Sequence, residues 1–230
     1  MRRHLPFGMI AVGALLLLGG SYVGLFRTPG ETYMGDVQRI MYVHVPTAWN
    51  ALLAFTYAFT AALLFLWRGG FGRDAHLEAA LEVGVVLSLL LCIQGSIWAR
   101  PTWGVYWDWD PRLTTTAIMC SAFAGIIALR AFVEDPVKRA TWSSVATIIS
   151  YVNVPLVYFS VRWWNSLHQV QSSPKTVSSV FILPLRINAF GVLFLMLGLL
   201  LVRARVAGLR RARETVDLPL SAPVPQEVRS

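Results

Sequence analysis

The chain has 230 residues, of which 56% are hydrophobic and 14% charged, with a mean hydropathy of +0.56 and a formal net charge of +8. Soluble domains carry closer to about a quarter of charged residues, so this composition excludes an ordinary soluble protein. The positive charge does not indicate nucleic-acid binding either, because no basic face interleaved with aromatic residues accompanies it.

Six apolar runs follow one another along the chain, and each is long enough to cross a hydrocarbon core of about 30 Å as a helix. The first run follows two arginines but lacks a small-residue cleavage site, so we interpret it as a retained anchor and not a signal peptide. The predicted fold class is all-α: a polytopic membrane protein with six transmembrane helices and a Trp-rich segment on its outer face. The expected spans are Phe7–Phe26, Thr47–Trp67, Ala79–Trp98, Leu113–Val133, Trp142–Val161 and Ile182–Val202.

The chain divides into a membrane domain over residues 1–203 and a tail over residues 204–230. The tail begins basic and then reads "LPLSAPVPQEVRS". Because that stretch is rich in proline and polar residues, we expect the tail to be disordered and cytoplasmic.

Few polar or reactive side chains interrupt the predicted spans. Cys92 and Cys120 lack the C-x-x-C spacing of a metal or redox site, and we interpret them as small packing residues. Asn153 and Pro155 in the fifth span predict a kinked helix, which explains them without a transport path.

Lys and Arg are divided unequally between the two sides of the membrane, and this asymmetry predicts orientation. Thirteen lie on the side that holds both termini and seven on the other, so we expect both termini to be cytoplasmic. The outer segments are then Arg27–Pro46, Ala99–Arg112 and Arg162–Phe181.

Two of the four histidines lie on the predicted outer side, close to the membrane boundary. His44 precedes the second span and His168 follows the fifth, whereas His4 and His76 lie on the inner side and are expected to be solvated. A single interfacial histidine needs no function. A pair that flanks an aromatic segment favours metal ligation, because neutral imidazole is the commonest protein metal ligand.

The stretch "WGVYWDWDPRLT", which begins at residue 103, concentrates indoles between the third and fourth spans. Pro111 favours Asp110 as the N-cap of the fourth span. If the stretch is extended, Trp103, Trp107 and Trp109 share one face; if it is helical, Trp103 and Trp107 still align. Either arrangement predicts a broad apolar plate parallel to the membrane.

Other tryptophans are explained by the aromatic belt that marks membrane interfaces. This explanation suffices for Trp67, Trp98, Trp142 and Trp49, but a belt does not place three indoles in one short loop beside two aspartates.

A porphyrin is the flat ligand that best matches this pattern. Its macrocycle would lie on the indoles, and its propionates need cations, for which the arginine fork is suited. Arg39 and Arg112 are the best-placed candidates; Arg100 is a third, although lipid headgroups explain it equally well. His44 and His168 would then be axial ligands of haem iron.

The pattern Trp-Gly-x-x-Trp-x-Trp-Asp-x-Arg-Leu-Thr resembles the tryptophan-rich WWD signature of haem-handling membrane proteins. Chain length and six spans resemble the smallest of these, the cytochrome c maturation protein C (CcmC) family. The resemblance extends over about residues 7–203 and includes the positions of both outer histidines.

This resemblance implies a protein that holds haem b at the outer face of the bacterial cytoplasmic membrane. It implies presentation of haem for covalent loading onto a periplasmic haem chaperone during c-type cytochrome maturation. It also implies two further partners, a small single-span helper protein and the subunits of an ATP-binding-cassette transporter. The implied cofactor-binding residues are Trp103, Trp107, Trp109, Asp110, Arg39 and Arg112, with His44 and His168 on the iron.

We expect a delivery protein and not an enzyme, because no catalytic nucleophile stands out. The alternatives are a haem permease or exporter and a b-type electron-transfer membrane subunit. The predicted spans carry no histidine, which disfavours the electron-transfer alternative.

Overall fold

The computed structural model describes residues 4–168 and 176–216, and these residues form a bundle of long helices. Six segments of this part of the chain are long and apolar enough to cross a membrane, which confirms the predicted all-α, six-span fold. The helices are α1 (Leu5–Phe26), the 3-10 helix η1 (Asp36–Ile40), α2 (Met41–Arg68), α3 (Phe71–Trp103), α4 (Pro111–Phe132), α5 (Pro136–Ser150), α6 (Asn153–Trp163) and α7 (Ser179–Val216).

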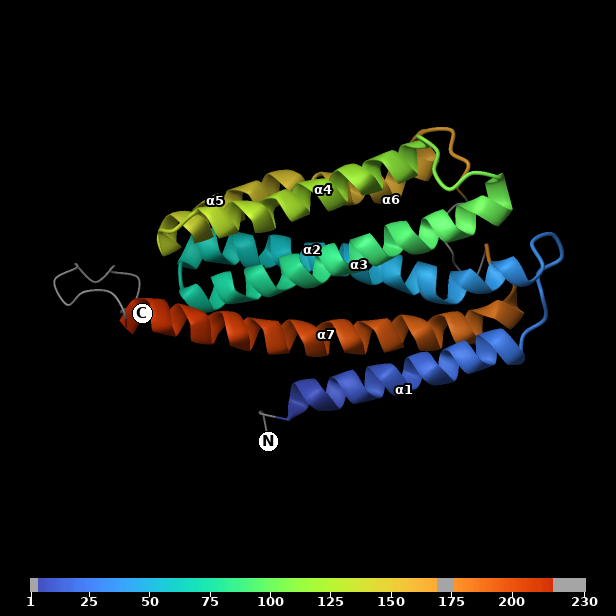
Figure 1. The fold of residues 1–230 in the computed structure, drawn as a ribbon, viewed down its shortest axis with the longest axis horizontal. Helices are drawn as coiled ribbons and strands as arrows, with labels where there is room; N and C mark the ends of the chain where they lie inside the picture. The colour runs from blue at the N-terminus through green and yellow to red at the C-terminus, as the bar shows by residue number, and fades with distance from the viewer. Residues whose placement is uncertain (1–3, 169–175, 217–230) are drawn as a thin grey trace.

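The helices are arranged in three layers (Figure 1). Helix α1 lies along α7, the pair α2 and α3 forms the middle, and α4 with α5 and α6 covers the other side. The segments that leave α1, α3 and α6 emerge at one end of the bundle, which we call the loop end. The described parts of the three predicted outer segments therefore lie on one side, as expected when consecutive spans alternate in direction.

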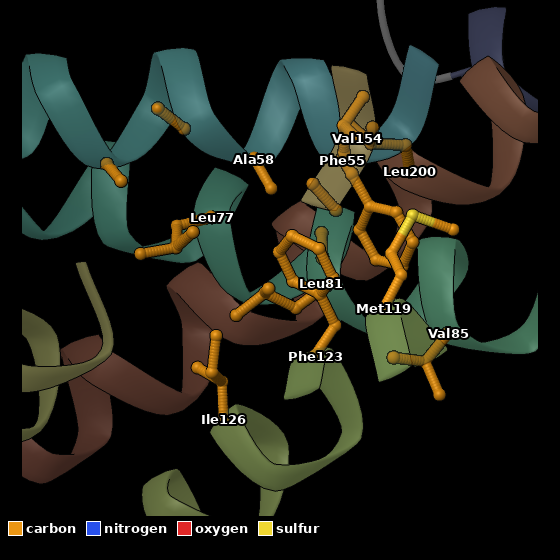
Figure 2. Packing of buried hydrophobic residues seen from close by; sticks show 14 of the residues in the cluster. Phe55, Ala58, Leu77, Leu81, Val85, Met119, Phe123, Ile126, Val154 and Leu200 are labelled. Carbon is orange, nitrogen blue, oxygen red and sulfur yellow. The ribbon is translucent and has the colours of Figure 1, made fainter. Parts of the chain in front are cut away.

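The main core lies where α2, α3 and α4 meet (Figure 2). The rings of Phe55 and Phe123 stack with centroids 3.8 Å apart and planes 9° from parallel. Leu77, Leu81 and Met119 surround them and are fully buried. Because close packing, not exclusion of water, holds helices together in lipid, this cluster fixes the spacing of the three helices that lead to the loop end.

Helix α2 begins at Met41, earlier than the predicted Thr47. Pro46 inside it has no N–H, so the carbonyl of Tyr42 loses its helical donor. The side-chain amide of Asn188 on α7 donates to that carbonyl at 2.8 Å and replaces the missing bond. In a bilayer each backbone group needs such a partner, so this tertiary bond allows the helix to extend past its proline.

The predicted kink in the fifth span is confirmed as a break between α5 and α6. Helix α5 ends at Ser150 and α6 begins at Asn153, whose amide reaches the Ser150 carbonyl at 3.4 Å. Pro155 cannot donate to the carbonyl of Tyr151, which accepts instead from the amide of Val154 at 2.9 Å.

The predicted disordered tail is wrong in its first part, because α7 remains helical beyond residue 204 and ends at Val216. Its sequence there is rich in alanine and arginine, which favour helix. Arg211 also donates to the fully buried Asp74 of α3 at 2.9 Å, which holds the extension against the bundle. The rest of the tail, residues 217–230, lies outside the described residues.

Asp74 belongs to a buried ion network at the end opposite the loop end. Arg130 of α4 donates to Asp74 and to Glu78, each at 2.8 Å, and to the hydroxyl of Ser143 on α5. Buried charges are tolerated only when they are paired and hydrogen-bonded, so these contacts join α3, α4, α5 and α7 firmly.

The loop after α1 forms a compact turn of its own. The carboxylate of Glu31 accepts hydrogen bonds from the backbone amides of Met34 and Tyr33, each at 2.7 Å. These two bonds hold the pKa of Glu31 below its usual value, because they stabilise the charged form.

Candidate functional site

A cavity opens at the loop end between α2, α3, α4 and α6 and the segment that follows α6. The empty space in this cleft, including its solvent-filled mouth, is about 1320 Å³. Most of the surface that lines it is apolar and aromatic, and the polar groups are few.

His44 lines this cavity from the first turns of α2 and is 7% exposed. Its Nδ1 is buried and has no hydrogen-bond partner among the described residues. The ring meets the edge of Trp98 at 5.4 Å between centroids and lies over Gly95, where a side chain would come within 3.2 Å of His44 Cε1. We expected no histidine within the spans, and this expectation is wrong. Because α2 begins early, His44 lies inside that helix, and His76 lies inside α3.

His168 lines the same cavity from the segment after α6. Its ring centroid lies 6.3 Å from that of His44, and the two ring planes differ by 26°. The edge of Trp103 approaches His168 at 6.1 Å between centroids. The structure thus brings together two imidazoles that are far apart in the sequence, as the flanking positions predicted.

Only one of the two arginines favoured for the propionates lines this cavity. Arg112, in the first turn of α4, lines it, and its Nη1 is buried without a partner in the described part of the chain. Arg39 instead donates to Asp36 at 2.8 Å and to the carbonyl of Gly24 at 2.6 Å. The 3-10 helix η1 turns Arg39 towards the end of α1, which the sequence spacing did not reveal.

The tryptophans also differ in whether they line the cavity. Trp103 and Trp107 line the cavity, but Trp109 does not; it is 77% exposed and meets the edge of Trp107 at 5.9 Å between centroids. Trp98 and Trp49 line the cavity as well, although the sequence assigned both to an aromatic belt. No sequence signal separates them from belt residues, because both lie within apolar spans.

The Trp-rich segment is neither fully extended nor helical. Helix α3 continues to Trp103 and ends at Gly104, whose φ of 80° is the left-handed conformation that glycine adopts readily. Helix α4 begins at Pro111 with Asp110 as N-cap, which confirms that prediction. Asp110 itself does not line the cavity; its buried carboxylate accepts hydrogen bonds from protein groups.

Three buried polar atoms at this cavity have no hydrogen-bond partner within residues 4–168 and 176–216: Nδ1 of His44, Nε1 of Trp98 and Nη1 of Arg112. Buried polar groups are rarely left unpaired, and a cluster of them at one cavity calls for an explanation. A ligand with anionic groups at one edge would supply acceptors to Arg112 and to the indole N–H. The site can therefore bind a molecule that brings hydrogen-bond acceptors to Arg112 and Trp98 and a partner to the imidazole of His44.

The fold and the cavity define a class of protein: a six-span helical membrane protein with an aromatic, histidine-containing site at its loop end. The chain belongs to the CcmC family, described as Heme exporter protein C, whose sequence pattern matches residues 1–218.

Individual relatives agree with this assignment. A Heme exporter protein C from Bradyrhizobium diazoefficiens is 34% identical over 224 residues, which cover 94% of this chain and 83% of that protein. Its counterpart in Escherichia coli is 31% identical over 203 residues, or 87% and 82% of the two chains. A ccmC-like mitochondrial protein of Marchantia polymorpha, named for cytochrome c biosynthesis, is 32% identical over 161 residues, or 70% and 68%.

Proposed function

We propose that this protein binds haem b at the outer face of the bacterial cytoplasmic membrane and presents it for covalent loading onto a periplasmic haem chaperone. The relatives' names, which refer to haem export and cytochrome c biosynthesis, support a role in c-type cytochrome maturation. The cavity at the loop end supports haem as the molecule handled.

The observation that carries the proposal is the spacing of the two imidazoles. Metal–imidazole distances are about 2 Å and each ring centre lies about 1 Å behind its nitrogen, so two rings on opposite sides of an iron would be about 6 Å apart. The centroids of His44 and His168 are 6.3 Å apart, which matches. Two imidazoles supply only two ligands, and no group of three or more His, Cys, Asp or Glu suited to a bare metal ion occurs among the described residues. A tetrapyrrole would bring the remaining ligands with its iron.

The other cavity groups suit the rest of a haem molecule. The indoles of Trp103 and Trp107 offer an apolar surface to the macrocycle. Arg112 offers a charged fork to a propionate, and its unpartnered Nη1 needs an acceptor. The protein's own contribution is then to bind haem and to fix its orientation towards an acceptor, so we propose a delivery protein and not an enzyme.

The excess of Lys and Arg on the side of the termini supports cytoplasmic termini and an outer loop end. A site on the outer side of the membrane is one from which a periplasmic chaperone can take haem. The proposed assembly also includes a small single-span helper protein and the subunits of an ATP-binding-cassette transporter, which the family resemblance supports.

The test is the absorption spectrum of the purified, detergent-solubilised protein, with pyridine haemochrome analysis of the bound tetrapyrrole. We expect a Soret band from haem b that is lost or strongly altered in a His44→Ala, His168→Ala double variant. The absence of a Soret band, or a band unchanged in the double variant, contradicts the proposal.

The relatives' name, Heme exporter protein C, favours a second candidate, a permease that moves haem across the bilayer. The cavity lining continues below the histidines to Leu52, Leu91 and Val157, inside the spans. Haem accumulation in vesicles that contain this protein without other components would favour the permease; binding without net transfer favours delivery.

A further inference from the structure

The carboxylate of Asp110 connects two segments of the loop end that are far apart in the sequence. It is 5% exposed and accepts the backbone amide of Arg112 at 2.8 Å, which caps α4. It also accepts the hydroxyl of Ser166 at 3.0 Å and the backbone amide of Leu167 at 2.7 Å. Asp110 thus holds the segment after α6 against the start of α4.

This connection ends at the second histidine. The hydroxyl of Ser166 donates to Asp110 Oδ1 and accepts the backbone amide of His168 at 3.1 Å. Both carboxylate oxygens are used, since Oδ1 binds Arg112 N and Ser166 Oγ while Oδ2 binds Leu167 N. Ser166 and Leu167 are thus bonded directly to the buried carboxylate of Asp110, and His168 is bonded to it through the Ser166 hydroxyl.

Capping explains only part of this arrangement. An N-cap needs one acceptor for one helical amide, and Asn or Ser serves nearly as well as Asp. A buried carboxylate costs much more to desolvate and is tolerated when several donors surround it. The donors beyond the cap come from the one irregular segment that carries a cavity imidazole, where no helix holds the backbone in place.

We propose that Asp110 and Ser166 are positioning residues that hold His168 opposite His44. This inference rests on the proposed haem function, and neither residue needs to touch haem: Asp110 and Ser166 do not line the cavity, whereas Leu167 and His168 do. Ligation by two imidazoles requires placement to within a fraction of an ångström, and a free loop would not supply it.

The most selective variant is Ser166→Ala, because it removes the hydroxyl bridge and leaves the cap of α4 intact. Asp110→Asn is the second, since asparagine keeps a capping oxygen but loses one of the two acceptor oxygens. Ser88→Ala is the matched control: Ser88 is buried and, in the described part of the chain, its hydroxyl donates to the carbonyl of Gly84 within α3.

The first readout is the haem spectrum of the purified full chain. We expect Ser166→Ala and Asp110→Asn to shift haem from six-coordinate towards five-coordinate and to raise its dissociation rate roughly tenfold, the loss of about one hydrogen bond to a charged group. Free imidazole should restore the six-coordinate spectrum, which a merely destabilised fold would not do. Ser88→Ala should retain the parent spectrum.

The second readout is hydrogen exchange of the amides of residues 166–168 in the protein without haem. Both loop-end variants should exchange faster there, and Ser88→Ala should not. If the parent protein binds haem but the two variants keep the parent's exchange rates or the parent's spectrum, the positioning role is overturned and the proposed function is left intact. A parent protein without a Soret band instead refutes the proposed function, and the inference falls with it.

Discussion

Arg112 offers a sharp test of the cavity, because it lines the cavity and its Nη1 has no partner in the described chain. Replacing it by glutamine keeps much of the side-chain length and the first turn of α4 but removes the charge. We expect Arg112→Gln to bind haem more weakly than the parent protein, since the propionate would lose its cationic partner.

The expected magnitude comes from the strength of a hydrogen bond between a guanidinium and a carboxylate. A hydrogen bond to a charged group contributes about 1.5–3 kcal/mol. Since about 1.4 kcal/mol corresponds to a tenfold change in affinity, the dissociation constant should rise by roughly 10- to 150-fold. Folding stability is measured separately, because the guanidinium charge also interacts with the buried Asp110.

The assay is a haem titration of the solubilised protein followed at the Soret band, with thermal unfolding measured in parallel. Arg39→Gln is the matched control, because Arg39 bonds to Asp36 and Gly24 at the end of α1 and does not line the cavity. We expect its affinity to stay within about twofold of the parent. Equal losses in both variants, or a loss in Arg39→Gln alone, would refute this assignment of the propionate site.

Four other substitutions test the remaining parts of the structure. Gly95→Ala should displace the ring of His44 by a few tenths of an ångström, since the new Cβ would lie 3.2 Å from its Cε1; an unchanged haem spectrum would contradict this. Trp107→Ala should weaken haem binding by about 1 kcal/mol, because Trp107 lines the cavity. Trp109→Ala should change haem binding little, because that indole is 77% exposed. A larger loss of haem from Trp109→Ala than from Trp107→Ala in a dilution assay would contradict this assignment. Arg130→Met should lower unfolding stability by about 3–5 kcal/mol, because it leaves buried carboxylates short of a partner, while the Soret maximum of surviving folded protein stays in place.

Local rules account for the features that the sequence predicted well. Crossing a bilayer depends on the length and apolarity of a single segment, so the six spans could be recognised without any knowledge of packing. The cap at Asp110 and the break near Pro155 depend on residues next to one another in the chain, and both are present.

Helix ends were predicted less well, because partners from other helices extend them. The start of α2 depends on Asn188, which replaces the hydrogen bond that Pro46 cannot make. The length of α7 depends on Arg211 and its bond to Asp74 on α3. A hydropathy pattern contains no information on either contact.

Amino-acid order is thus enough to reveal six membrane spans and a pattern of indoles, arginines and histidines near the ends of those spans. Which members of that pattern share a cavity is a property of the folded chain: Arg112 and Trp98 face it, while Arg39 and Trp109 do not. The physical reason is that lipid and protein interior are equally apolar, so an indole or an arginine stem near the interface has the same sequence surroundings whichever way it points. Its direction is set by the rotation of each helix against its neighbours.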